Sequence, residues 1–209
     1  MQRQLELLAV LLSAVVFLVL PKPPAAVAPI AAFIVLCMGG WSTYLVAQVR
    51  RDPTLLERWG LRPTTNLGPL LRVLGPLAAL AVALGVGVAI ARGKPLVAEW
   101  MWLSLLLYPL WGLVQQWLVQ ALVVDNVRAL TGLGLPGLMA LGAVGFGVIH
   151  LEHPLLMVAT AGLGGVYVAL FQRWRNLWPL AACHGWLGSL FYPWVLDLNP
   201  IGELMGLLG

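Results

Sequence analysis

Long apolar runs, separated by short polar or proline-rich stretches, fill almost the whole chain. The runs cover residues 5–20, 25–49, 69–91, 96–124, 136–150, 154–171 and 177–196. Most approach or exceed the roughly 20 residues that an α-helix needs to cross a bilayer. They do not alternate between apolar and polar residues, as the strands of a membrane barrel do. The pattern therefore predicts an all-α, polytopic membrane protein with about seven transmembrane helices.

The composition narrows this prediction. The chain is 61% hydrophobic and 10% charged, and its apolar runs recur from one end to the other, so we expect residues 1–209 to form a single membrane domain. A net charge of +4 would suggest nucleic acid in a soluble protein. Here the basic residues flank apolar runs, which is typical of topology control, and the expected partner is membrane lipid, with no nucleic acid. Cys37 and Cys183 lie inside apolar runs, where we expect small buried hydrophobic residues and no disulfide.

The basic residues also predict an orientation. With seven spans, the N-terminus and three loops share one side, and this side holds most of the cations. The richer side carries Arg3, Arg50, Arg51, Arg58, Arg62, Arg72, Arg128, Arg173 and Arg175, and the other carries Lys22, Arg92 and Lys94. The positive-inside rule then predicts a multi-pass cell (inner) membrane protein with a cytoplasmic N-terminus. Losing one weak span, above all the short 136–150, would invert the far half.

The longest polar stretch covers residues 50–68, between the second and third spans. It has the composition of a short helix at the membrane interface. We expect Leu55, Leu56 and Trp59 to face lipid there and the arginines to face headgroups.

Three glutamines lie within the fourth apolar run: Gln115, Gln116 and Gln120. Positions four apart share a helix face, so Gln116 and Gln120 point the same way. A buried glutamine has donors and an acceptor that lipid cannot satisfy. We expect a polar cavity shared with the histidines His150 and His184. The alternative is that these groups are scattered interhelical hydrogen bonds, worth about 0.6–2 kcal/mol each.

The stretch from Gly145 to His153 holds two of the three histidines, His150 and His153, together with Glu152. Ionisable groups at membrane depth are costly and are usually functional. Glu152 and His153 precede the turn at Pro154, so a position at the outer interface is the simpler interpretation for them. The His-Glu-x-x-His zinc motif does not match, because the histidines are three apart. A zinc site of His150, His153 and His184 remains an alternative by ligand type, although the pattern indicates no required cofactor or metal.

These residues resemble the CAAX prenyl protease and bacteriocin-processing family of intramembrane glutamic endopeptidases. The family pattern is Glu-Glu-x-x-x-Arg on one helix, Phe-x-x-x-His on the next and His-x-x-x-Asn on a later one. Residues 146–150 match the second motif, and His184 matches the histidine of the third. The resemblance covers residues 50–196 and implies a bundle like that of CAAX proteases.

The chain departs from the family at two motifs. Gln115, Gln116 and Gln120 replace the two glutamates and the arginine, so the spacing is kept and the charges are gone. Glutamine can hold a water but cannot accept its proton. Gly188 stands at the Asn position, which removes a donor whose loss typically costs about 10²–10³ in rate. Changing the three charged residues together avoids an unpaired buried arginine, which indicates a rebuilt neutral site.

Two functional hypotheses follow. The first is a divergent CAAX-protease-like intramembrane endopeptidase, acting on a peptide or protein through a polar cavity between spans four, five and seven. His150 or Glu152 would be the base, His184 the electrostatic stabiliser and Gln116 a ligand for water, with Gln115 and Gln120 beside it. The second is a catalytically inactive relative that binds a peptide tail or lipid in an immunity, chaperone or regulatory role. Glu152 separates them, because a carboxylate in the cavity favours the first.

Overall fold

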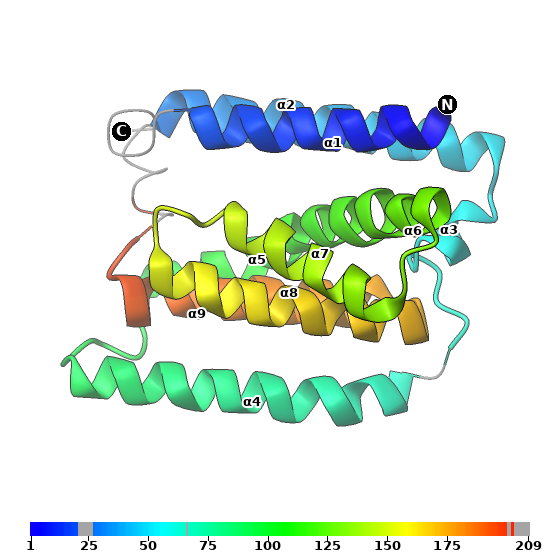
Figure 1. Cartoon of the computed structure of the whole chain (residues 1–209). Helices are drawn as coiled ribbons and strands as arrows, with labels where there is room; N and C mark the ends of the chain where they lie inside the picture. The colour runs from blue at the N-terminus through cyan, green and yellow to red at the C-terminus, as the bar shows by residue number, and fades with distance from the viewer. Residues whose placement is uncertain (21–26, 66, 200–201, 203–209) are drawn as a thin grey trace. The chain divides into compact units, whose positions relative to one another are not determined.

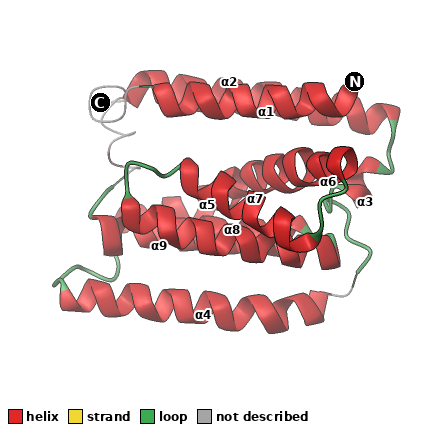
Figure 2. Cartoon of the chain, in the orientation of Figure 1, coloured by secondary structure: helices red, strands yellow, loops and turns green. Residues whose placement is uncertain are grey.

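All regular structure in the described part of the chain is helical (Figure 2). The computed structural model describes residues 1–20, 27–65, 67–199 and 202. Figure 1 labels the helices α1 to α9, and two further segments, η1 and η2, are π-helical. Their bounds are α1 Gln2–Val19, α2 Val27–Arg51, α3 Leu55–Arg58, α4 Leu67–Ala91, α5 Glu99–Trp117, η1 Leu118–Val124, α6 Asp125–Thr131, α7 Leu135–Val148, α8 Pro154–Trp174, α9 Leu177–Phe191 and η2 Tyr192–Leu196.

The prediction of a polytopic helical membrane protein is confirmed. In the described residues, five helical segments are long and apolar enough to cross a membrane: α1, α2, α4, the continuous segment from α5 to α6, and α8. The predicted fifth span is the 14-residue α7, which at 1.5 Å per residue is only about 21 Å long. It ends at Val148, and residues 149–153 lead from it to Pro154, the first residue of α8. The predicted seventh span is α9 continued by η2.

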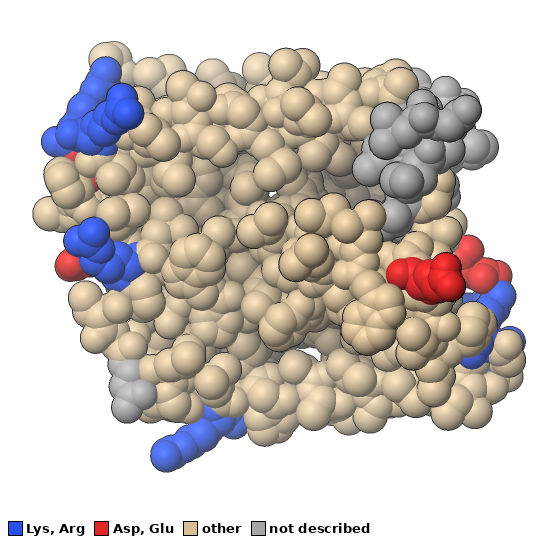
Figure 3. Space-filling model, turned by 180° about the vertical axis from the view of Figure 1, so that it is seen from behind, with Lys and Arg blue, Asp and Glu red and all other residues tan. Residues whose placement is uncertain are grey.

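The chain divides into two compact units. Unit 1 comprises Met1–Leu20, Leu36–Thr65 and Gln115–Leu177, and unit 2 comprises Pro21–Val35, Asn66–Val114 and Trp178–Gly209. The charged side chains on the face seen in Figure 3 lie toward the helix ends, with uncharged surface between them. This distribution is what a hydrocarbon environment requires of membrane-spanning helices.

Within unit 1, α7 and α8 pack closely side by side through glycines (Figure 1). A Cβ atom on Gly142 would lie 2.4 Å from Cγ2 of Val168, and one on Gly164 would lie 2.6 Å from the carbonyl oxygen of Gly142. Small residues allow such backbone approach between membrane helices. Against this helix pair, η1 contributes Val124 to a core cluster with Leu138 and Val168.

The fourth apolar run was placed at residues 96–124, but the helix continues past Val124 through α6 to Thr131. Asp125 accepts a hydrogen bond from Nε2 of Gln172 at 2.8 Å and pairs with Arg175. The side-chain amide of Asn126 donates to Oε2 of Glu6 at 2.5 Å. Because protein partners satisfy these polar groups, they do not need water at a helix end.

The expectation that the apolar side chains of the interfacial helix face lipid was wrong. Leu55 and Trp59 are buried at 7% and 6% exposure. The Trp59 ring packs edge-on against the Trp117 ring, with 5.4 Å between the ring centroids. The amide of Leu177 donates to the carbonyl of Gly60 at 3.0 Å, which ties this segment to the residue that follows the α8–α9 turn. Gly60 has φ +70°, a conformation that favours glycine. The segment therefore packs into unit 1 with its apolar side chains inward.

The arginine-rich segments of unit 1 meet at one end. Gln2, at the start of α1, donates to Gln48 near the end of α2 at 3.2 Å. Thr65 donates to the carbonyl of Trp174 at 2.6 Å, and Arg128 donates to Gln172 at 2.6 Å. The N-terminus and the three predicted cytoplasmic loops thus share an end of this unit, as the orientation requires. The inner-membrane location and the cytoplasmic side stay predictions.

Unit 2 contains two helix contacts of its own. The end of α4 meets η2, where Arg92 donates to the carbonyl of Val195 and Lys94 pairs with Asp197. Helix α5 meets α9, where a Cβ atom on Gly185 would lie 2.5 Å from the backbone nitrogen of Pro109. Glycine is required at this crossing because the two backbones touch.

Candidate functional site

A pair of buried glutamines lies where α5 passes into η1. Gln116 and Gln120 both have 0% exposure, and Nε2 of Gln120 donates to Oε1 of Gln116 at 3.2 Å. This bond confirms that the two side chains share a helix face. Gln115, one position earlier, is only partly buried. The pair is therefore the polar centre of this segment.

The hydrogen bond between the two glutamines leaves one donor and one acceptor of the pair unsatisfied. Nε2 of Gln116 and Oε1 of Gln120 are buried without a hydrogen-bond partner in the described part of the chain, as is Nε1 of the neighbouring Trp117. An unsatisfied buried polar group costs about 1–3 kcal/mol. Two donors and one acceptor so close together form a set that a water molecule or a peptide group would satisfy.

The backbone at the pair is also unusual. The π-helical segment η1 begins at Leu118, two residues after Gln116, and contains Gln120. Short π-helical stretches are rare and occur frequently at functional sites. The position of this one, between members of a buried polar pair, makes packing alone an incomplete explanation for the glutamines.

His150 lies in the turn after α7, and its ring is held by two contacts. Nδ1 lies 2.8 Å from the carbonyl oxygen of Phe146 and 3.3 Å from Oγ1 of Thr160. A carbonyl can only accept, so this contact assigns the proton to Nδ1 and leaves the lone pair on Nε2. A histidine held in this tautomer can accept a proton through Nε2.

Thr160 on α8 is a site residue that the sequence reasoning missed. It is buried at 8% exposure, and its hydroxyl lies 2.8 Å from the carbonyl of Leu156 and 3.1 Å from that of Phe146. Its one proton can serve one of these carbonyls, which leaves the oxygen free to accept from His150. A hydroxyl on an apolar span, ten residues after a histidine, was the available signal.

Glu152 and His153 do not join the buried residues. Glu152 is exposed in the turn between α7 and α8, and His153 is partly exposed. No group of three His, Cys, Asp or Glu side chains that could hold a metal ion occurs among the residues that the structure describes.

The buried carboxylate in unit 1 is Glu6, which the sequence reasoning also missed. It accepts hydrogen bonds from Nε2 of Gln2 at 3.0 Å, from the Tyr44 hydroxyl and from Asn126. These donors join α1, α2 and α6, so Glu6 is a packing centre of this unit. A lone acid one turn into an apolar run was its signal.

His184 lies on α9 in unit 2 and is partly exposed. The next residue, Gly185, forms the backbone contact with Pro109 that fixes α9 against α5. Gly188 has more room, because a Cβ atom there would lie 3.7 Å from the Tyr108 ring, an ordinary contact. A larger side chain at the family's Asn position is therefore sterically acceptable.

Comparison with known proteins identifies the segment that carries these residues. The Rce1-like family model, described as type II CAAX prenyl endopeptidase Rce1-like, matches residues 94–190. The matched range includes the glutamines, His150, Thr160 and His184. No curated protein matches the chain, and no solved structure matches it. The resemblance seen in the motifs is confirmed: residues 94–190 of this membrane protein match the Rce1-like model, in agreement with the CAAX prenyl protease and bacteriocin-processing family that the motifs resemble.

Proposed function

We propose that the chain is a divergent intramembrane endopeptidase that holds a peptide segment at the Gln116–Gln120 pair. The observation that carries this proposal is the unsatisfied donor on Gln116 and acceptor on Gln120, at the positions of the family's Glu-Glu-x-x-x-Arg motif. A peptide group offers the complementary carbonyl and N–H. A buried site that binds such a group recovers the cost of the unpaired atoms.

Hydrolysis requires a base, and His150 is the candidate. Its Nε2 takes a proton from water, the hydroxide attacks the peptide carbonyl carbon, and the same proton passes to the leaving amine as the C–N bond breaks. Gln116 donates to the attacking water or the carbonyl oxygen. His184 would stabilise the oxyanion, a role that comes from the family resemblance.

A second candidate is a protein that binds a peptide tail without cleaving it. The exposure of Glu152 favours this second candidate, because the carboxylate that was the alternative to His150 as base is not among the buried groups. A site with paired amides and no carboxylate base binds a peptide group as well as before, but it lacks the family's proton acceptor.

One experiment separates the two. The full chain is reconstituted in lipid nanodiscs with a farnesylated peptide ending in Cys-aliphatic-aliphatic-X, and binding and cleavage are measured together. Gln116→Met removes the Gln116 side-chain amide, both its donor and its acceptor, at similar size, and His150→Ala removes the base, with His153→Ala as its matched control. Cleavage lost in His150→Ala but kept in His153→Ala supports the endopeptidase.

The other outcomes are equally definite. Binding without cleavage that is lost in Gln116→Met supports the second candidate. Cleavage that survives His150→Ala overturns the assignment of the base. No binding of this peptide excludes a CAAX-type substrate, and binding that Gln116→Met leaves unchanged overturns the glutamine pair as the site.

A further inference from the structure

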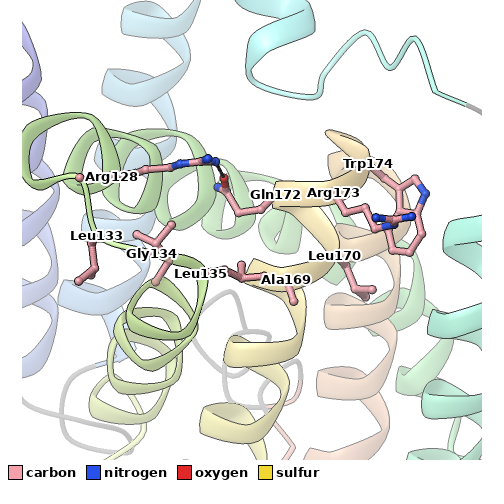
Figure 4. Close-up of a pocket in the computed structure, with 11 residues that line it drawn as sticks. Arg128, Leu133, Gly134, Leu135, Ala169, Leu170, Gln172, Arg173 and Trp174 are labelled. Carbon is pink, nitrogen blue, oxygen red and sulfur yellow. Dashed lines mark hydrogen bonds between the residues drawn. The ribbon is translucent and has the colours of Figure 1, made fainter.

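An open depression lies at the arginine-rich end of unit 1, apart from the glutamines and His150. Its volume is about 690 Å³, and residues from α6, the α6–α7 loop, α7 and the end of α8 line it (Figure 4). Two arginines, Arg128 and Arg173, and one glutamine, Gln172, are its polar side chains. The lining contains no acidic residue.

The charge around the depression is positive. Arg175 pairs with Asp125, so these two charges cancel. Arg128 donates only to the neutral amide of Gln172, and the described contact of Arg173 is with the Trp174 ring at 5.3 Å. Two cations therefore remain without a carboxylate among the described residues. Both can donate several hydrogen bonds to an anion.

The backbone has mixed effects on this charge. Helix α7 starts at the depression, and Gly134 caps it without a side-chain hydrogen bond, so the first N–H groups of α7 add positive character. Helices α6 and α8 end there, and their carbonyls favour cations. The helix ends therefore offset one another, and the arginine charges determine the sign.

The floor of the depression is apolar. Leu138 and Leu170 are buried at 1% and 5% exposure, and the exposed side chains of Leu133 and Leu135 flank them. Trp174 stands at the rim beside Arg173, as Figure 4 shows. Tryptophan and arginine are characteristic of the headgroup level of a membrane. A basic rim above an apolar floor matches an amphiphile with an anionic head.

We propose that this depression binds the headgroup of an anionic phospholipid, with the phosphate on Arg128 and Arg173 and the first acyl carbons over Leu138 and Leu170. Basic pockets between membrane helices hold anionic headgroups in this way. A free phosphate would use the arginines alone and leave the apolar floor uncovered. The site is independent of the peptide chemistry proposed above.

The test titrates the full chain, in neutral detergent, with short-chain phosphatidylglycerol and with phosphatidylcholine of the same acyl length. Each surface arginine contributes about 1 kcal/mol, so Arg128→Gln/Arg173→Gln should weaken phosphatidylglycerol binding about tenfold to thirtyfold. Arg128→Lys/Arg173→Lys should retain most of it. The exposed Arg72, near the start of α4, provides the matched control as Arg72→Gln.

Gly134→Leu tests the depression itself. Its backbone, φ −73° and ψ 168°, suits any residue, and a Cβ atom would meet only Pro136 at 3.9 Å. The leucine should fill the space and weaken binding with both arginines present, while the thermal unfolding midpoint shows that the fold is kept. The proposal is overturned if Arg72→Gln weakens phosphatidylglycerol binding as much as the double variant does. It is also overturned if a folded Gly134→Leu variant binds phosphatidylglycerol as well as the wild type. Displacement of the lipid by inorganic phosphate at equal concentration overturns the role of the apolar floor.

Discussion

Gln120 donates from Nε2 to Oε1 of Gln116, one turn earlier on the same buried face. The family's motif has a glutamate and an arginine at these two positions, which would form a charged version of the same contact. The neutral pair therefore keeps the geometry of donor and acceptor while removing the charges. What it gives up is the ability to take a proton from water.

A single charge introduced at the Gln116–Gln120 pair should destabilise the protein, and a pair of opposite charges should not. Gln116→Glu places an unpaired carboxylate at a fully buried position, and we expect a loss of about 3–5 kcal/mol in the free energy of unfolding. Adding Gln120→Arg supplies the counter-charge and should recover most of this loss. Chemical denaturation in detergent measures both variants, with the exposed Gln4→Glu as a control. A neutral effect of Gln116→Glu alone would show that the pair reaches water.

The tautomer of His150 is open to direct measurement. The chain has three histidines, so His153→Ala/His184→Ala leaves His150 alone for ¹⁵N NMR. We expect the neutral ring to carry its proton on Nδ1, since the Phe146 carbonyl lies 2.8 Å away. Thr160→Val should leave this tautomer dominant, because the closer acceptor remains. A switch to Nε2–H in Thr160→Val would assign the tautomer to Thr160 instead.

The contact between α7 and α8 should be intolerant of a single methyl group. Gly142→Ala and Gly164→Ala each place a Cβ atom 2.4–2.6 Å from atoms of the neighbouring helix, and overpacking of this kind costs about 1–3 kcal/mol. Gly145 and Gly162 lie on the same two helices with nothing within 4 Å of their Cβ positions. Gly145→Ala and Gly162→Ala should therefore be neutral or stabilising by up to about 1 kcal/mol. Equal thermal stabilities for the two pairs would contradict the packing described.

The ion pair between Lys94 and Asp197 predicts a pH dependence. The hydrogen bond and charge of Lys94 lower the pKa of the Asp197 carboxyl below its ordinary value of 3.8. A lowered pKa in the folded state means that the contribution to stability is present above pH 3.8 and is lost as pH falls through the folded value. Both groups are at the surface, so the effect is small. Thermal midpoints of the wild type and Asp197→Asn should converge in acid, and a difference that persists there would contradict the pair.

Hydropathy predicted the membrane helices, because their burial in lipid depends on composition alone. It could not locate the end of the fourth run, since Asp125 and Asn126 read as termination signals until their partners Arg175, Gln172 and Glu6 are known. Those partners lie 47 to 120 residues away along the chain. Local pattern carries no information about such distant contacts.

The candidate site was predicted in part. The spacing of Gln116 and Gln120 was sufficient to place them on one face, and the hydrogen bond between them follows from it. Thr160 was missed because threonine is ordinary in membrane helices, and its contact with His150 depends on how α8 packs against α7. Leu55 and Trp59 were expected to face lipid, because an amphipathic segment looks the same in sequence whether protein or bilayer covers its apolar side.

The π-helical turn has a consequence for the helix that contains it. A π-helical turn holds more residues than an α-helical one, so η1 shifts the phase of everything that follows. The side chains after Val124 are therefore rotated, about the helix axis, from the directions that an uninterrupted α-helix would give them. The contacts of Asp125 with Gln172 and of Asn126 with Glu6 are made in this shifted register. If 118–124 became α-helical with no residue removed, these two side chains would rotate by about 100° relative to Gln116, whereas deleting one residue together with the π-helical turn would leave them at nearly their present angle.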